Sequence, residues 1–167
     1  MKPVNHIQIK NPLTVNELVK QMHLTGVLGA GRLGKAVNIC EAMMKDRQCK
    51  VFLGLAGPLV PCGMREIIID IIENKWVDVV VTTGATLTHD LGEALGYRHY
   101  QGRADADDAA LHKKGFDRIY ESYMPNEIYE GMEDFIDKNF EKLKEKKSIK
   151  EFLWEIGRLT PNKSILK

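Results

Sequence analysis

The sequence predicts an α/β fold in which parallel strands alternate with helices. Two apolar, β-branched runs favour strands, KVFLGLAG at 50–57 and WVDVVVTTGA at 76–85. Segments with helical spacing of apolar residues follow each of them, at 63–75 and 88–96. A strand–helix–strand–helix order is typical of a parallel sheet. Because such a sheet needs several strands and only two are clear, we expect this chain to form part of a larger sheet.

Two amphipathic helices are expected before the first strand. The first covers 13–22, where Thr14 is a suitable N-cap and Glu17 follows three residues later to complete a capping box. The second covers 33–45, LGKAVNICEAMMK, whose apolar residues also recur at helical spacing.

The central segments are predicted as two strand-to-helix crossings. Helix 63–75 follows the first strand, and its core stripe is Met64, Ile67, Ile68, Ile71 and Ile72. The second strand ends in Thr-Thr-Gly and leads to helix 88–96, for which Thr88 is the expected N-cap and Gly96 the stop signal.

The last third of the chain is predicted to be mostly helical. The expected elements are a short helix at 104–115, a strand with a turn at Pro125–Asn126 in 116–126, a long amphipathic helix at 127–145, a charged connection at 145–150 and a helix at 148–160. The chain ends in TPNKSILK, and no element is expected to close this end.

Bulk composition excludes several classes of protein. The 24 Lys+Arg residues balance 23 Asp+Glu, so nucleic acid and anionic membranes are not expected partners. No apolar run approaches the ~20 residues that cross a bilayer, and the first ten residues lack the apolar core of a secretory signal. Three cysteines without a CxxC pair fit reduced thiols in the cytoplasm. The five histidines are scattered, so no metal site is expected.

Residues 29–34, GAGRLG, match the G-x-G-x-x-G pattern of dinucleotide-binding proteins. That chemistry needs a preceding strand and an acidic residue at the end of the next strand, about 20 residues on. Only Val27–Leu28 are strand-like before Gly29, and the next strand ends in Leu55-Ala56-Gly57. A glycine-rich approach to a tightly packed helix is the favoured interpretation, and a nucleotide fingerprint is the alternative.

The loops within 55–66 and 81–96 have better context for a ligand site. Each leaves a strand and enters a helix, and ligands of open parallel sheets bind at the carboxyl ends of strands. Glycines allow close approach of the backbone, and helix N-termini offer free N–H groups. Hydroxyls are supplied by Thr82, Thr83, Thr86 and Thr88. These features predict a small-molecule site suited to anions, although every βα loop also needs turn residues.

The stretch FLGLAGPLVPCGMREIIIDIIENKWVDVVVTTGATLTHDL, 52–91, resembles deoxyhypusine synthase. The resemblance continues through GEALGYRHYQG, PNEIYEGMEDF and FLWEIG, and upstream through TVNELVKQMHLTGVLGAGRLGKAVNICEAMM. It implies a Rossmann-like parallel sheet with flanking helices, incomplete because the chain matches the N-terminal half of the family fold. It further implies one domain over 1–167, with a helical portion at 1–48 and an α/β portion at 49–167. GAGRLG then matches the start of a family helix, with no nucleotide role.

The resemblance also implies an activity. The family transfers the aminobutyl group of spermidine, by way of an enzyme lysine, to a lysine of a translation initiation factor. NAD is the cofactor, and the enzymes are usually cytoplasmic tetramers with sites between subunits. The matching cofactor loops are Gly57-Pro58-Leu59-Val60-Pro61 and Thr83-Gly84-Ala85, with His89 as a further cofactor contact. The family's acidic pair, which helps to hold the polyamine and the cofactor, falls on Thr88-His89.

The Thr88-His89 pair is a departure from the family pattern. We expect His89 beside the nicotinamide or the amine, where an imidazole that titrates near neutral pH would assist proton movement. A helix-cap histidine facing solvent is the alternative. Asp90 is expected at the start of the helix, where its charge suits the dipole.

The family's nucleophilic lysine has no counterpart in this chain. It lies in a Trp-Gly-Lys context, and neither Trp76 nor Trp154 is followed by Gly-Lys. No catalytic residue is therefore expected here, and a complementary C-terminal half or chain is the expected partner, in a homo- or hetero-oligomer. Open alternatives are an inactive regulatory or scaffold subunit, a synthase-like enzyme that uses another amine, and a generic oxidoreductase that uses GAGRLG.

Overall fold

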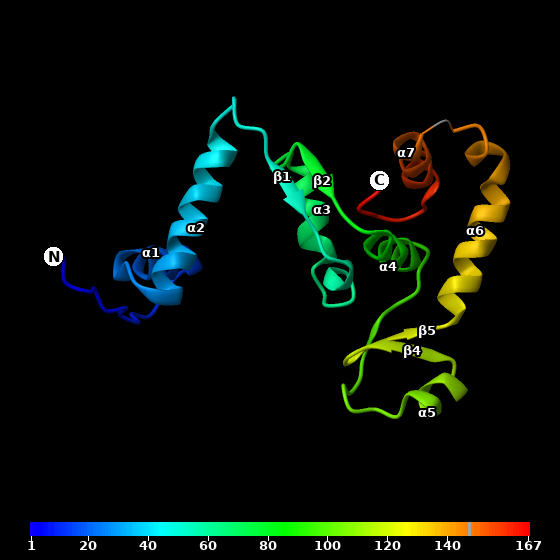
Figure 1. Cartoon of the computed structure of the whole chain (residues 1–167), viewed down its shortest axis with the longest axis horizontal. Coiled ribbons are helices and arrows are strands. Elements are labelled where there is room, and N and C mark those ends of the chain that lie inside the picture. Colours follow the sequence, from blue (N-terminus) through cyan, green and yellow to red (C-terminus); the bar gives the residue numbers. More distant parts are fainter. Residues whose placement is uncertain (147) are drawn as a thin grey trace. The chain divides into compact units, whose positions relative to one another are not determined.

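The computed structural model describes residues 1–146 and 148–167, which divide into two compact units, Met1–Val51 and Phe52–Lys167 (Figure 1). The single domain expected over 1–167 stays a prediction. None of the described helices is long and apolar enough to cross a membrane.

The first unit is a pair of helices, α1 (Val15–Thr25) and α2 (Leu28–Lys45). The predicted capping box is confirmed, because the Thr14 hydroxyl accepts from the Glu17 N–H and the Glu17 carboxylate accepts from the Thr14 N–H. The chain turns between the helices at Gly26, whose φ of 72° suits glycine.

The GAGRLG segment lies inside the first turns of α2, and α1 with its C-cap precedes it where a nucleotide fingerprint needs a strand. A Cβ on Gly31 would lie 2.6 Å from the carbonyl carbon of Gly26, and one on Gly34 would overlap the His23 backbone. The glycines therefore serve close packing of α2 on α1, as the favoured interpretation holds. The predicted start of this helix at 33 was too late, because the packing outweighs the low helix propensity of glycine.

The second unit contains the predicted parallel crossing. Strands β1 (Phe52–Gly54) and β2 (Val79–Val81) pair in parallel, with Phe52 opposite Val79 and Gly54 opposite Val81. The short 3-10 helix η1 (Gly57–Leu59) and helix α3 (Arg65–Glu73) connect them. The predicted α/β fold with parallel strands and flanking helices is confirmed.

Helix α4 (Gly84–Ala94) begins directly after β2, so the prediction that it begins at Thr88 was wrong. Its N-cap is Thr83, and the Thr88 hydroxyl donates to the Gly84 carbonyl within the helix at 3.0 Å. A threonine inside a helix can satisfy its hydroxyl in this way, so its preference for caps does not locate the helix start. Asp90, expected at the helix start, instead lies in the interior of α4 and is fully buried.

A second, antiparallel sheet follows, with strand order β3 (Tyr100–Gln101), β5 (Ser122–Pro125), β4 (Phe116–Ile119). Helix α5 (Asp108–Lys113) precedes β4. The single strand predicted in 116–126 was wrong, because β4 and β5 form a hairpin that turns at Tyr120–Glu121. Neither turn residue is typical of a turn, and Tyr120 adopts a φ of 52°, which non-glycine residues seldom do.

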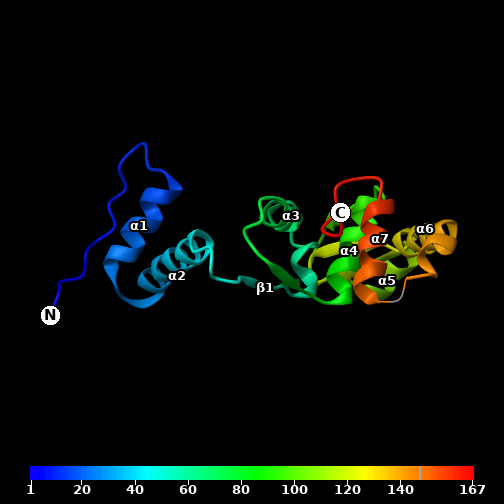
Figure 2. The ribbon, with the colours of Figure 1, turned by 90° about the horizontal axis from the view of Figure 1, so that it is seen from above.

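Helices α6 (Glu127–Leu143) and α7 (Ile149–Leu159) complete the unit as predicted. Lys147, in the predicted charged connection, lies outside the described residues. Figures 1 and 2 show α4 between α3 and α6. The core that joins α4, α6 and α7 consists of Leu91, Phe135, Leu143 and Ile156. This packing fixes α4, from which the candidate site is built.

Candidate functional site

The two predicted cofactor loops meet at one edge of the parallel sheet. A Cβ added to Gly57 would lie 3.0 Å from Cβ of Ala85 and 3.3 Å from the Thr83 hydroxyl oxygen. The structure therefore brings Gly57, Thr83 and Ala85 together. A Cβ at position 57 would require its neighbours to shift by a few tenths of an ångström, which gives the glycine a steric reason at this position.

Two hydroxyls hold the loop after β1 against α4. The Thr86 hydroxyl donates to the Ala56 carbonyl at 3.2 Å, and the Thr82 and Thr86 hydroxyl oxygens lie 2.7 Å apart. Oγ1 of Thr82 also lies 3.3 Å from the carbonyl oxygen of Leu55. Since hydrogen bonds of this kind contribute about 1 kcal/mol each, the contacts keep the two strand ends in register.

The N-terminus of α4 suits an anionic ligand. Thr83 makes no side-chain hydrogen bond to the first turn of the helix, and a Cβ on Gly84 would meet no atom within 4 Å. First-turn N–H groups together with the helix dipole attract phosphate oxygens. The residues present thus fit the diphosphate of a dinucleotide such as NAD. Of the predicted cofactor residues Leu59 and Val60, Leu59 is half-buried and Val60 is only 2% exposed.

Three titratable side chains, those of His89, His99 and Glu93, form a row beside α4. Ala85, His89 and Glu93 are spaced four residues apart and so share one helix face. Nδ1 of His89 lies 3.0 Å from Nε2 of His99, and Nδ1 of His99 lies 2.8 Å from a Glu93 oxygen. The histidines that look scattered in the sequence thus include one hydrogen-bonded pair. His89 is 8% exposed, so the alternative of a solvent-facing cap histidine was wrong.

The environment shifts the pKa of two members of this row. Burial lowers the pKa of His89, the adjacent His99 lowers it further, and Glu93 opposes both. Burial raises the pKa of Glu93, but the hydrogen bond from His99 and the positive charges nearby outweigh it, so the Glu93 pKa lies below its usual value. At neutral pH the row therefore combines an ionised carboxylate with a neutral His89 imidazole.

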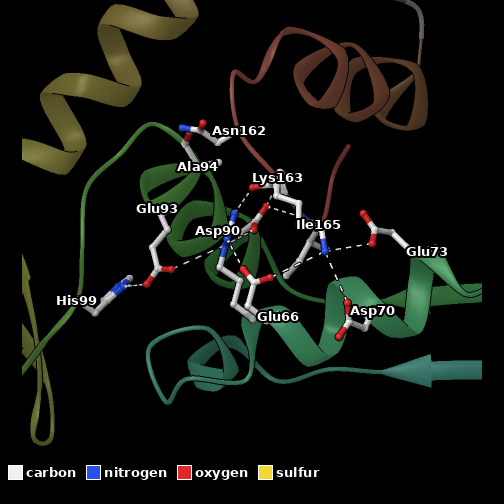
Figure 3. A network of polar contacts seen from close by, with 12 residues as sticks. Glu66, Asp70, Glu73, Asp90, Glu93, Ala94, His99, Asn162, Lys163 and Ile165 are labelled. Carbon is white, nitrogen blue, oxygen red and sulfur yellow. Dashed lines mark hydrogen bonds and ion pairs between the residues drawn. The ribbon is translucent and has the colours of Figure 1, made fainter.

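Asp90 anchors a second polar group on the neighbouring face of α4 (Figure 3). One carboxylate oxygen accepts from Nε of Arg65 at 2.9 Å. The other accepts from the Ser164 hydroxyl at 2.6 Å and from the Ile165 N–H at 3.0 Å. Its buried charge is thus compensated by a cation and two further donors.

The C-terminal segment lies over α3 and α4 and is held there through this carboxylate. Arg65 also donates to the Lys163 carbonyl, and Asn162 donates to the Ala94 carbonyl at 2.9 Å. The Lys163 ammonium lies beside three carboxylates of α3, those of Glu66, Asp70 and Glu73 (Figure 3). The sequence analysis did not predict the buried ion pair between Asp90 and Arg65. The available signal was the position of acidic Asp90 between apolar residues of a helix.

A pocket of about 510 Å³ is lined in part by His99. Its lining includes three of the predicted cofactor residues, Pro58, Val60 and Pro61, together with Glu93 and His99. The other predicted site residues do not line it; they are Gly57, Leu59, Thr83, Gly84, Ala85, Thr88 and His89. Half-buried Thr88 is tied to its own helix backbone, and its contact with substrate stays a prediction.

The fold and this edge define a class of protein, the α/β proteins in which two successive βα loops of a parallel sheet meet. A family model named deoxyhypusine synthase matches residues 17–167. The chain therefore belongs to the deoxyhypusine synthase family.

Curated relatives extend the match. A Methanosarcina thermophila protein named "Probable deoxyhypusine synthase" is 42% identical over 167 residues, which cover 99% of this chain and 52% of that protein. A Methanothermobacter thermautotrophicus protein of the same name is 41% identical, covering 92% of this chain and 51% of that protein. A deoxyhypusine synthase-like protein of Chlorobaculum parvum is 39% identical over 124 residues, 74% of this chain and 35% of the relative.

The fold is also seen in a crystal structure of an Entamoeba histolytica protein assigned as a deoxyhypusine synthase. The TM-score is 0.58 at 17% identity, covering 99% of this chain and 57% of that chain. This chain thus spans about half the length of the relatives that it matches.

Proposed function

We propose that this chain forms the cofactor-loop half of a deoxyhypusine synthase. The complete enzyme would transfer the aminobutyl group of spermidine to a lysine of a translation initiation factor, with NAD as cofactor. The meeting of Gly57 with Thr83 and Ala85 at one sheet edge carries this proposal, because it puts both family-matched loops beside one helix N-terminus.

Each part of the edge has a distinct task in this proposal. The N-terminus of α4, at Thr83-Gly84-Ala85, binds cofactor phosphate. The segment Gly57-Pro58-Leu59-Val60-Pro61 forms the opposite wall, and Pro58 and Pro61 reach the pocket. When bound, NAD would accept a hydride from the amine. His89, neutral because burial lowers its pKa, offers the amine a hydrogen-bond acceptor.

The nucleophilic lysine would come from the complementary half, as a separate chain or segment. An apolar surface in the second unit supports such a partner: Phe52, Val79 and Val81 of the parallel strands are 67%, 38% and 57% exposed. Exposed apolar residues on a short parallel sheet favour association with further elements. By family resemblance, we further propose that the complete enzyme is a tetramer in the cytoplasm. Its acceptor would be a translation initiation factor.

Reconstitution tests this function. The chain is mixed with the complementary half of the family protein, NAD and spermidine, and NADH formation is followed by absorbance. We expect turnover in the mixture and none with either half alone. Size-exclusion chromatography shows whether the two halves form a stable complex. A stable complex without turnover would contradict the proposal.

A regulatory subunit is the second candidate. The observation in its favour is Thr88-His89 in place of an acidic pair, since neither residue offers the carboxylates that attract a polycation. This role predicts that the chain raises the rate of an intact family enzyme without binding NAD itself. A synthase-like enzyme for another amine predicts turnover of the same mixture with a different amine in place of spermidine.

A further inference from the structure

Glu93, His99 and His89 form one continuous hydrogen-bonded row. Glu93 and His89 lie one turn apart on α4, and His99 comes from the segment between α4 and β3 to lie between them. The two imidazole rings meet edge to face, with ring centroids 5.0 Å apart. The row is largely enclosed, because the His99 and Glu93 side chains are only 7% and 18% exposed.

The carboxylate at one end determines where the protons lie. An ionised Glu93 can only accept, so the 2.8 Å contact requires a proton on Nδ1 of His99. When the His99 imidazole is neutral, its other nitrogen carries the lone pair, so Nε2 of His99 then accepts from Nδ1 of His89 at 3.0 Å. Nε2 of His89 is left as a bare acceptor.

That last nitrogen is available to a ligand. Among residues 1–146 and 148–167 the structure gives Nε2 of His89 no hydrogen-bond partner. The one buried side-chain nitrogen or oxygen without a partner in the same residues is Oδ1 of Asn126, so Nε2 of His89 is not sealed inside the protein. It can therefore meet a donor from outside.

We propose that Glu93 is a positioning residue that acts through His99 to hold His89 in the Nδ1–H tautomer, with Nε2 presented as a hydrogen-bond acceptor. The inference that this acceptor receives an N–H of the substrate amine rests on the proposed function, whereas the tautomer does not. Free imidazoles favour the opposite, Nε2–H tautomer, so the row reverses an ordinary preference and turns a donor into an acceptor.

The tautomer is directly measurable. In the chain labelled with ¹⁵N-histidine, long-range ¹H–¹⁵N correlation spectra at about pH 8.5, above the usual imidazole range, separate protonated from bare nitrogens. We expect His89 to show a protonated Nδ1 and a bare Nε2, with a preference of roughly tenfold or more, the strength of a charge-assisted hydrogen bond. Exposed His112 supplies the ordinary preference in the same spectrum.

Variants test whether Glu93 determines the tautomer of His89. Glu93→Gln removes the charge at constant size and should reduce the His89 preference to a mixture. Glu66→Gln, which also removes a carboxylate beside Arg65, should leave it intact. Should Glu93→Gln fail to fold, His99→Phe removes the link and should return His89 to the Nε2–H form shown by His112.

Two results would overturn the proposal. One is Nε2–H on His89 in the unaltered chain, and the other is an unchanged tautomer in Glu93→Gln. Because the spectra need neither cofactor nor a second chain, they decide the inference even where reconstitution yields no turnover. In an active mixture, Glu93→Gln should raise KM for spermidine several-fold.

Discussion

Asp90 shows what a single residue does in this chain. Its carboxylate joins α4 to Arg65 on α3 and to the Ser164–Ile165 segment, at zero exposure. Removing one member of a buried ion pair leaves the other charge uncompensated, and that cost exceeds the net value of the pair.

We predict that Asp90→Ala lowers the free energy of unfolding of the second unit by about 3 kcal/mol, measured by urea denaturation. Asp70→Ala is the matched control, because Asp70 is a solvent-exposed carboxylate paired with Lys163, and should cost well under about 1 kcal/mol. Equal effects of the two variants would show that the Asp90 network adds no stability.

The His89 side chain makes the stability of the second unit depend on pH. Its folded-state pKa is lowered from 6.5, chiefly by burial, so below that value the unfolded chain binds more protons than the folded one. Its contribution to stability is therefore full above about pH 6.5 and falls as the pH drops below it. His89→Gln should lose less stability than the unaltered chain between about pH 7.5 and 5.5, as thermal denaturation can measure. A steeper loss in the variant would contradict the assignment.

Elements differ in how far local sequence determines them. The two strand-to-helix crossings were predictable, because apolar β-branched runs and helical periodicity are local signals. The start of α4 was missed because the Thr88 hydroxyl bonds to the Gly84 carbonyl inside the helix, and the β4–β5 hairpin was missed because Tyr120 adopts a positive φ that its residue type does not announce. Meeting of the two loops was expected from parallel pairing, whereas the His89–His99 pair joins separate segments and has no local signal.

The close packing of α2 on α1 depends on the glycines of α2. Gly34→Ala places a Cβ onto the His23 backbone and should destabilise the first unit by about 2 kcal/mol or more. Gly29→Ala, in the same segment, meets open space and should be neutral or slightly stabilising, because alanine favours helix. Loss of helical circular dichroism on heating measures both; a tolerated Gly34→Ala would contradict the close packing.

Comparison with its family relates the two units of this chain to longer proteins. It belongs to the deoxyhypusine synthase family and spans about half of the length of its relatives, and in the part of the chain that the structure describes β1 and β2 form a two-stranded sheet. Its parallel strands expose apolar side chains, and its sequence contains no Trp-Gly-Lys stretch. We propose that the edge at Gly57 and Thr83–Ala85, and not GAGRLG, receives the cofactor.

Binding of NAD to two matched variants of the reconstituted protein distinguishes the two candidate cofactor sites. Gly84→Asp and Gly29→Asp each put a carboxylate into open space in the first turn of a helix, where it favours the helix dipole and preserves folding. Isothermal titration calorimetry should find NAD affinity lowered by about tenfold or more in Gly84→Asp, because the new charge repels phosphate, and unchanged in Gly29→Asp. The reverse pattern would assign the cofactor to GAGRLG and contradict the account.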